Sequence, residues 1–263
     1  MPDIFYGFLG LFVGSFLNVC IWRLPRNESL VFPASHCPEC GTRLRPEELI
    51  PVLSYIVQRG RCRNCLGAIK ARYPTVEILT GIVFYICAAH ASAGAGQMIE
   101  GAGANLTGEV LFLKNIIFLS ALLVIFFIDL DHQIIPDAIS IPLVPIGLAF
   151  AFAAGRNAML FDSLKAAAAG FAGFYLIAAA GQMLFKREAM GGGDIKLAAA
   201  LGAFLGMEQM LVGLFLAFIL GVAVGVPLAL IKGSGLRKPI PFGPMIAMGA
   251  AIALFKTSAI VAW

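Results

Sequence analysis

Eight apolar stretches divide this chain of 263 residues, and most are long enough to cross a lipid bilayer. A spanning helix takes about 20 residues, so eight spans would use about 160. The length therefore predicts an all-α polytopic membrane protein of about eight transmembrane helices, with room for one small domain outside the bilayer. The stretches lie at 4–24, 74–93, 109–129, 134–154, 161–185, 194–207, 209–231 and 240–262.

The composition agrees with lipid as the main solvent of the chain. Hydrophobic residues make up 60% and charged residues 13%, whereas soluble proteins carry about 25% charged residues. The alternating pattern of a membrane barrel is absent, which leaves helices as the spanning elements. The first stretch is preceded by Asp3 and no basic residue, so we expect a retained span and not a cleaved leader. The modest net charge of +4 argues against nucleic-acid binding.

Basic residues predict the orientation in the membrane. Fifteen of the 19 lysines and arginines fall in three segments, at 23–72, 186–196 and 232–238. With eight spans these segments share one side, which the positive-inside rule makes cytoplasmic. Both termini and the segment 94–108, which has no basic residue, then face outward. The expected organisation is a first helix at 1–24, a cytoplasmic loop domain at 25–73 and a seven-helix membrane core at 74–263.

The loop domain carries four cysteines in two CxxC pairs. Such pairs offer four thiolates to one tetrahedral ion and are typical of structural zinc sites. Gly41 and Gly67 follow the pairs closely, as tight knuckle turns require. Disulfides are the alternative, but thiols stay reduced in the cytoplasm. The predicted zinc ligands are Cys37, Cys40, Cys62 and Cys65, whereas Cys20 and Cys87 lie in apolar stretches and are expected to be buried.

Acidic residues cluster at two apolar boundaries that the topology places at the cytoplasmic edge. Asp129, Asp131 and His132 end the third stretch, and Asp194 follows three glycines, Gly191 to Gly193, at the start of the sixth. Intramembrane carboxylates are costly and tend to be functional. Two carboxylates that share one proton can activate water and protonate a peptide carbonyl, which is the chemistry of aspartyl proteolysis.

Other interpretations of these clusters stay open at this stage. The glycines could form a hinge or a close helix contact, and Asp131 with His132 could be an ordinary polar boundary. Asp137 could begin the fourth helix, and Lys196 could anchor its helix at the interface or tune Asp194. A metal site at Asp129, Asp131 and His132 would lack a further ligand nearby. Transporters also place aspartates at broken glycine-rich helices, so a proton- or cation-coupled transporter is the alternative function.

The chain resembles the bacterial type IV prepilin peptidases, a family of leader peptidases and N-methyltransferases with a GxGD aspartyl protease motif. The resemblance covers nearly the whole chain, and its motifs occur in order. They are 14–19 with 23–25, the cysteine segments 35–40 and 60–65, 72–74 with Glu77, 129–136, 191–194 and 239–244.

The resemblance implies an enzyme of the bacterial inner membrane that cleaves the basic leader from type IV prepilins or type II secretion pseudopilins after a glycine. The catalytic pair carries over to Asp129 and Asp194. The essential aspartate of the family lies seven residues before a proline, which selects Asp129 over Asp131 because the proline here is Pro136. Asp131, Gly191, Gly193 and Lys196 are candidate accessory residues. Glu39, Glu47 and Glu48 could meet leader lysines, although they are also ordinary surface charges.

The resemblance also implies methylation of the new N-terminal residue with S-adenosylmethionine as donor. No GxGxxG loop follows a strand, so a Rossmann-type donor site is excluded. The family associates the activity with the cysteine loop and with motif positions that here include Asn18 and Glu77. From the residues alone, Asn18 could instead pair two helices, and Glu77 could form an ion pair with Arg72 or Arg23. A third interpretation is a scaffold protein of a secretion machine whose loop is ordered by zinc. This interpretation would leave the paired aspartates unexplained.

Overall fold

The computed structural model describes residues 2–94, 108–155, 157–186, 190–232 and 241–261. The described residues are helical and contain no strand beyond two isolated β-bridges. They form two compact units, and α4 contributes to both: Leu111–Val124 belongs to the first unit, and the residues from Ile125 onward belong to the second. Residues 95–107 of the predicted outer segment lie outside the described residues. The same is true of three basic residues, Arg187, Arg237 and Lys238.

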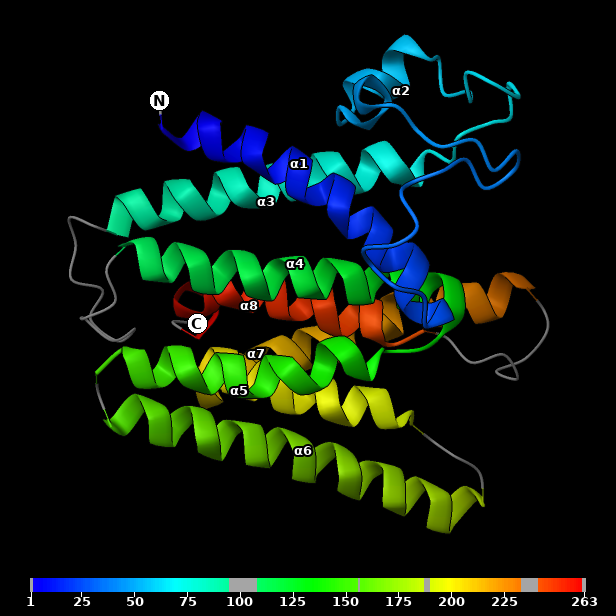
Figure 1. Ribbon diagram of the computed structural model, residues 1–263. Helices are drawn as coiled ribbons and strands as arrows, with labels where there is room; N and C mark the ends of the chain where they lie inside the picture. The colour runs from blue at the N-terminus through cyan, green and yellow to red at the C-terminus, as the bar shows by residue number, and fades with distance from the viewer. Residues whose placement is uncertain (1, 95–107, 156, 187–189, 233–240, 262–263) are drawn as a thin grey trace. The chain divides into compact units, whose positions relative to one another are not determined.

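The first unit contains the long helices α1 (Pro2–Arg23) and α3 (Arg72–Gly94), which lie side by side (Figure 1). Small residues bring the two backbones together. A Cβ atom at Gly10 would stand 2.7 Å from the carbonyl oxygen of Thr80, and one at Gly14 would stand 2.7 Å from the Cα of Glu77. Close approach through glycine is the usual way in which membrane helices pack, since lipid offers no hydrophobic drive between them.

The loop between these helices, for which the sequence predicts a small domain, belongs to the same compact unit. It contains the short helices η1 (Leu24–Arg26), η2 (Pro46–Leu49) and α2 (Leu53–Val57). Between residues 24 and 71 the only buried side chains are Cys37, Pro51 and Cys62. The loop therefore has no apolar core of its own.

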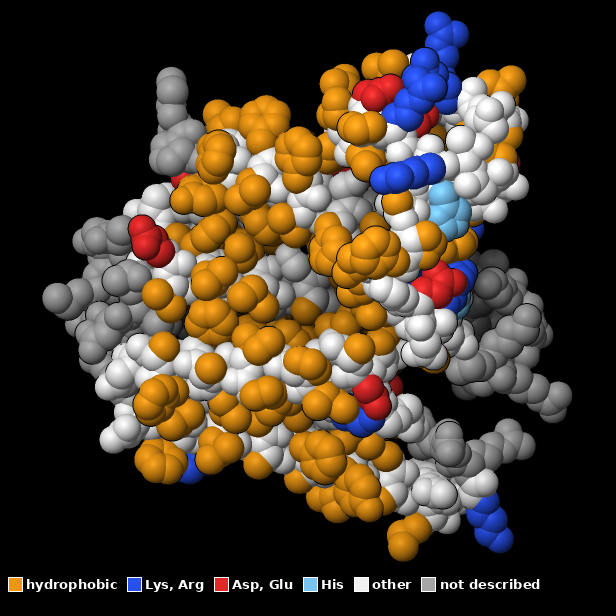
Figure 2. Space-filling view, viewed as in Figure 1, with side chains coloured by type: hydrophobic (Ala, Val, Ile, Leu, Met, Phe, Trp, Pro, Cys, Tyr) orange, Lys and Arg blue, Asp and Glu red, His pale blue; other side chains and the backbone are white. Residues whose placement is uncertain are grey.

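The second unit packs the end of α4 (Gly108–His132) with α5 (Asp137–Ala153), α6 (Asn157–Phe185), α7 (Gly192–Lys232) and α8 (Gly243–Val261). Five helices of the described chain are long and apolar enough to cross a membrane, and α5 and α8 supply shorter apolar segments. Their outer surfaces carry large apolar side chains such as Phe161, Phe171 and Phe215, and Figure 2 shows many side chains of this kind over the helices. The chain is thus a multi-pass membrane protein.

The helix α7 is interrupted at Gly206, whose backbone (φ 77°, ψ 179°) is not helical. Before the break, Gly202 packs on Ala166 and Ala198 packs on Gly170, so this part runs antiparallel to α6. After the break, Met210 contacts Gly170 and Phe218 contacts Phe174. This second part runs in the same direction as α6, so the chain reverses its direction at Gly206. The sequence predicted two helices here, 194–207 and 209–231, and the break falls at the predicted boundary.

Asp162 of α6 stabilises this reversal through a contact with the turn of α7. Its Oδ2 accepts a hydrogen bond from the backbone N–H of Met207 at 3.0 Å, which satisfies one of the free donors at the start of the second part of α7. The same carboxylate lies against Gly206, where any Cβ atom would overlap it. Gly206 therefore provides both the left-handed φ and the space that the turn needs.

We expect Gly206→Ala to lower the free energy of unfolding by about 1–3 kcal/mol, because alanine is strained at this φ and collides with Asp162. Gly173→Ala is the matched control, since a Cβ atom at Gly173, within α6, would meet no neighbouring atom within 4 Å. The measurement is thermal or denaturant unfolding of both variants in the same detergent. Equal stability of the two variants would contradict a reversal held by Gly206.

Candidate active site and candidate metal centre

Asp129 lies near the end of α4 and is buried, with 5% of its surface exposed. Its Oδ2 accepts a hydrogen bond from the backbone N–H of Gly243 at 2.9 Å. Gly243 is the first residue of α8, so the carboxylate sits at a helix N-terminus, where free N–H groups favour negative charge. A Cβ atom at position 243 would stand 2.8 Å from Oδ2, and only glycine allows this contact without a shift.

Asp194 lies in the first turn of α7 and is half-buried. Its backbone N–H donates to the carbonyl oxygen of Gly191 at 3.1 Å, which starts the helix. The carboxyl group is close enough to Asp129 for the two charges to interact. The structure therefore brings together two carboxyl groups that are 65 positions apart in the sequence. When two carboxyl groups lie close enough to interact, the charge on one makes it less favourable to ionise the other.

Asp131 and His132 differ from Asp129 because both are exposed. Within the described part of the chain, the four loop cysteines are the only group of His, Cys, Asp or Glu side chains with the spacing of a metal site. The trio of Asp129, Asp131 and His132 does not have this spacing, so the structure gives no support to a metal site at the end of α4.

Lys196 forms an ion pair with Asp137, with its Nζ 2.6 Å from Oδ1 and 2.7 Å from Oδ2. Asp137 is the first residue of α5, in agreement with one interpretation of the sequence. The pair joins the beginnings of α5 and α7 two residues after Asp194. Lys196 therefore contacts another helix through Asp137.

The glycines before Asp194 have different surroundings. A Cβ atom at Gly193 would stand 2.8 Å from the Cβ of Ile135, so this glycine allows α7 to begin against the segment that follows α4. A Cβ atom at Gly191 would meet only the Asp194 carboxylate, at 3.5 Å, and one at Gly192 would meet nothing. Of the three, Gly193 is the one used for close packing.

The four loop cysteines converge although they come from two separate turns. Their sulfur atoms all lie within 4.8 Å of one another. Cys37 and Cys65 are 3.9 Å apart, Cys40 and Cys62 are 4.0 Å apart, and all four thiols are free. Tetrahedral zinc with Zn–S bonds of about 2.3 Å requires sulfur atoms about 3.8 Å apart. The donor set and its spacing therefore fit a structural zinc ion.

The two turns have the same backbone pattern. Cys37 N–H donates to Thr42 and Gly41 N–H donates to Cys37, while Cys62 N–H donates to Gly67 and Leu66 N–H donates to Cys62. The left-handed residue is Gly41 (φ 69°) in the first turn and Leu66 (φ 59°) in the second. In the second turn the left-handed position thus belongs to Leu66 and not to Gly67, which instead leaves room for the Glu39 side chain.

The charges of the thiols also favour a bound cation. Hydrogen bonds with Thr42 and Asn64 lower the pKa of Cys40 to about 6. Backbone N–H groups of Cys65 and Asn64 lower the pKa of Cys62. Although a backbone hydrogen bond at Gly67 acts in the opposite direction, burial and the neighbouring thiols raise the pKa of Cys65 to about 12. Without a cation the cluster keeps a proton, whereas a divalent ion would allow four thiolates.

Asn18 and Glu77 occupy the contact between α1 and α3. The amide nitrogen of Asn18 donates to the carbonyl oxygens of Tyr73, at 3.0 Å, and Gly14, at 3.3 Å. Glu77 is buried, and its Oε2 accepts the backbone N–H of Val52 at 2.7 Å. Arg23, a partner considered for Glu77, instead donates to the carbonyl oxygens of Ser29 and Pro33. Asn18 therefore joins α1 to the first turn of α3, and Glu77 joins α3 to the loop at Val52.

Sequence reasoning missed Gly243 as a partner of Asp129. The signal was present, because the segment 239–244 was among the motifs of the resemblance, but no role followed from its composition. The contact depends on where α8 begins, and residues 239 and 240 lie outside the described part of the chain.

Two family models match this chain. The family described as "Bacterial Peptidase A24 N-terminal domain" matches residues 8–91, which include the four cysteines, Asn18 and Glu77. The family described as "Type IV leader peptidase family" matches residues 116–226, which include Asp129 and Asp194. No solved structure matches the chain.

Three curated relatives carry the name prepilin leader peptidase/N-methyltransferase. The protein of Myxococcus xanthus is 41% identical over 88% of this chain, and the match spans 64% of its own length. The protein of Aeromonas salmonicida is 33% identical over 100% of this chain and 94% of its own. The protein of Pseudomonas aeruginosa is 34% identical over 94% of this chain and 87% of its own length. The transporter alternative finds no support among these relatives, and the chain belongs to the type IV leader peptidase family.

Proposed function

We propose that this protein cleaves the basic leader from type IV prepilins or type II secretion pseudopilins, after a glycine, and methylates the new N-terminal residue. The observation that carries the proposal is the meeting of Asp129 and Asp194, from α4 and α7, within one partly buried site. Relatives that match this chain over most of its length are named for both activities.

The peptidase step follows from the two carboxyl groups. The ionised carboxylate accepts a proton from water while the water oxygen attacks the scissile carbonyl carbon. The protonated carboxyl group donates its proton to the carbonyl oxygen, which gives a neutral tetrahedral intermediate. The newly protonated carboxyl group then gives its proton to the amine nitrogen as the C–N bond breaks. The other carboxylate takes a proton from a hydroxyl group of the intermediate, which becomes the product acid, and the pair returns to its initial state. The Gly243 N–H holds one oxygen of Asp129, so the other oxygen is available to water or substrate.

Methyl transfer needs a donor with an activated methyl group, and S-adenosylmethionine supplies one as a sulfonium. The chain would have to present the freed amine without its proton. Asn18 and Glu77 are the candidate residues on the first unit. The contact of Asn18 with Tyr73 joins α1 to α3, and the contact of Glu77 with Val52 supports a role in holding the loop domain against α3.

We infer that Cys37, Cys40, Cys62 and Cys65 bind one structural zinc ion, a proposal supported by the sulfur separations and the absence of a disulfide among them. Zinc at this position would take no part in either reaction. It would order a loop domain that buries almost no other side chain.

We further propose eight spans with both termini outside and the cysteine loop in the cytoplasm. A straight helix of 41 residues would be about 60 Å long, twice the thickness of the hydrocarbon core. The reversal at Gly206 supports two spans in its place. With this topology we propose domain divisions at 1–24, 25–73 and 74–263. The concentration of basic residues in 23–72 supports the proposed orientation in the inner membrane.

The test uses the purified full-length protein in lipid nanodiscs with a prepilin-like substrate that has a basic leader, a glycine, a phenylalanine and an apolar helix. Mass spectrometry should show the leader released after the glycine and, with S-adenosylmethionine present, one added methyl group on the new terminus. Cleavage without methylation would restrict the proposal to the peptidase. An intact substrate across a panel of leaders, together with proton or cation flux in liposomes, would favour the transporter.

The ion pair of Lys196 and Asp137 gives a prediction for this reaction. We expect Lys196→Met to lower kcat for cleavage about tenfold, because α5 no longer fixes the beginning of α7 and a small displacement of Asp194 is costly. The exchanged pair Asp137→Lys with Lys196→Asp should restore much of the loss. Steady-state kcat and KM for the wild type and the two variants make the measurement, and an unchanged kcat in Lys196→Met would contradict a positioning role.

A further inference from the structure

The short helix α2 exposes apolar side chains although it lies outside the spanning helices. Leu53 is 54% exposed, Ile56 63% and Val57 72%. Leu66, in the second cysteine turn, is 66% exposed and lines the same pocket as Leu53 and Val57. A domain surrounded by water would gain stability by covering such side chains, so their exposure points to an apolar surrounding.

The position of α2 along α3 indicates what this surrounding is. The residue before α2 is Val52, whose backbone N–H donates to Glu77 at 2.7 Å. Glu77 lies five residues after the start of α3 at Arg72, which corresponds to about 7.5 Å along the helix axis. The candidate membrane span also begins at Arg72. The start of α2 is thus held beside the spanning helix at the level where headgroups meet acyl chains.

Two further features keep the loop domain in this place. The domain is joined to α1 at one end and to α3 at the other, so it cannot leave the membrane surface. Val52 has φ 60° and ψ −48°, a conformation that a β-branched residue rarely adopts. A strained backbone of this kind persists only where its contacts hold it, and the buried Glu77 carboxylate provides the contact.

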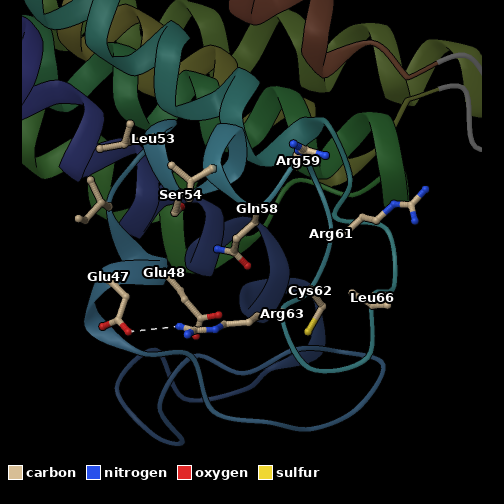
Figure 3. Close-up of a pocket in the computed structure, with 12 residues that line it drawn as sticks. Glu47, Glu48, Leu53, Ser54, Gln58, Arg59, Arg61, Cys62, Arg63 and Leu66 are labelled. Carbon is tan, nitrogen blue, oxygen red and sulfur yellow. Dashed lines mark ion pairs between the residues drawn. The ribbon is translucent and has the colours of Figure 1, made fainter.

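Beside α2 lies a pocket of about 1000 Å³ (Figure 3). Its apolar lining consists of Ile50, Leu53, Val57 and Leu66, and its cationic lining consists of Arg59, Arg61 and Arg63. Apolar and cationic linings in one open pocket match a ligand that has an acyl chain and an anionic headgroup.

The acidic residues of the pocket are already engaged. Glu47 lies 3.6 Å from Arg63 and 3.8 Å from Arg45, and Glu48 accepts the backbone N–H of Arg45 at 2.8 Å. Arg59 and Arg61 have no carboxylate at ion-pair distance among the residues that the structure describes. These two guanidinium groups remain to bind an anion, and phosphate is the anion that a membrane surface offers.

We propose that α2 and this pocket form a binding site for an anionic phospholipid of the leaflet beside the loop domain. Leu53, Ile56 and Val57 enter the boundary between headgroups and acyl chains, and Arg59 and Arg61 bind the phosphate. The basic charge of the segment 23–72 is complementary to such a lipid. The lipid holds the loop domain against the membrane.

The first experiment measures the depth of α2. Tryptophan is placed at position 56 by Ile56→Trp and, as a matched control, at another exposed position of the loop domain by Arg43→Trp. Both full-length proteins are reconstituted in bilayers whose acyl chains carry bromine near the headgroup, and the wild-type spectrum is subtracted. We expect strong quenching for Ile56→Trp and little for Arg43→Trp. An unquenched, water-like emission from Ile56→Trp would overturn the proposal.

The second experiment tests the headgroup. Short-chain phosphatidylglycerol is titrated into Ile56→Trp protein in neutral detergent, with short-chain phosphatidylcholine as the uncharged comparison. Each arginine is expected to contribute about fivefold to the affinity for the anionic lipid, so Arg59→Gln with Arg61→Gln should weaken it about 25-fold. The control Arg43→Gln with Lys70→Gln removes the same charge elsewhere in the loop and should have little effect. Equal losses of affinity in both double variants would show that only the total charge of the loop matters, which would overturn the pocket assignment.

Discussion

Asp129→Asn and Asp194→Asn are each expected to lower the rate of prepilin cleavage by about 10³-fold. Asparagine keeps the size and much of the hydrogen bonding of aspartate, but its amide neither accepts a proton from water nor donates a carboxyl proton. One carboxyl group must accept the proton of water and the other must donate a proton to the carbonyl oxygen, so the loss of either group stops the reaction. The Gly243 N–H still finds an oxygen acceptor in Asp129→Asn, so the end of α4 should keep its contact with α8. The measurement is the initial rate of leader release under saturating substrate.

Asp131→Asn is the matched control, because Asp131 lies two residues from Asp129 but is exposed. We expect this variant to cleave at nearly the wild-type rate. Thermal unfolding of all three variants in the same detergent separates lost chemistry from lost folding. A normal rate for Asp129→Asn together with a large loss for Asp131→Asn would transfer the catalytic role to Asp131.

The distinction between Asp129 and Asp131 illustrates what the sequence could tell. Acidic residues at an apolar boundary were visible in the pattern, and the resemblance selected Asp129 through its spacing from Pro136. The physical difference between the two appears only with the end of α4 in place, where one carboxylate is buried against Gly243 and the other is exposed. Contacts of this kind join segments more than 100 positions apart and leave no local pattern.

The helices were easier to predict than their ends. Each apolar stretch corresponds to helical residues, because the cost of unpaired backbone groups in lipid leaves few alternatives. The break within α7 was predicted near 208 and lies at Gly206. The reason for the break, a carboxylate of α6 against a glycine of α7, could not be predicted, since Asp162 is an ordinary boundary residue in the sequence.

The cysteine loop shows a different limit. The spacing of the two CxxC pairs predicts that four thiols meet, and they do. The sequence named Gly41 and Gly67 as turn residues, but the left-handed residue of the second turn is Leu66, and Gly67 instead packs against the Glu39 side chain. It also gave no sign that α2 is fixed to Glu77, since that contact depends on the placement of the whole domain.

Cys62→Ser is expected to remove the metal from the loop domain and to leave the domain without fixed structure. Serine is a poor zinc ligand, and three thiols cannot complete the tetrahedral site that the four sulfur atoms outline. Structural zinc contributes about 10–16 kcal/mol of apparent binding free energy in small domains. The loop has little to replace it, because Cys37, Pro51 and Cys62 are its only buried side chains between residues 24 and 71.

The measurement is the zinc content per chain after extensive dialysis, combined with limited proteolysis of the loop. Wild-type protein should retain one zinc ion, whereas Cys62→Ser and Cys37→Ser should retain none and should be cut rapidly within the loop. Cys20→Ala is the matched control, because Cys20 is buried in α1 and lies outside the group of four thiols. This variant should keep both zinc and protease resistance. A full equivalent of zinc in Cys62→Ser would show that the four sulfur atoms are not the ligands, and the order of the loop would then need another source.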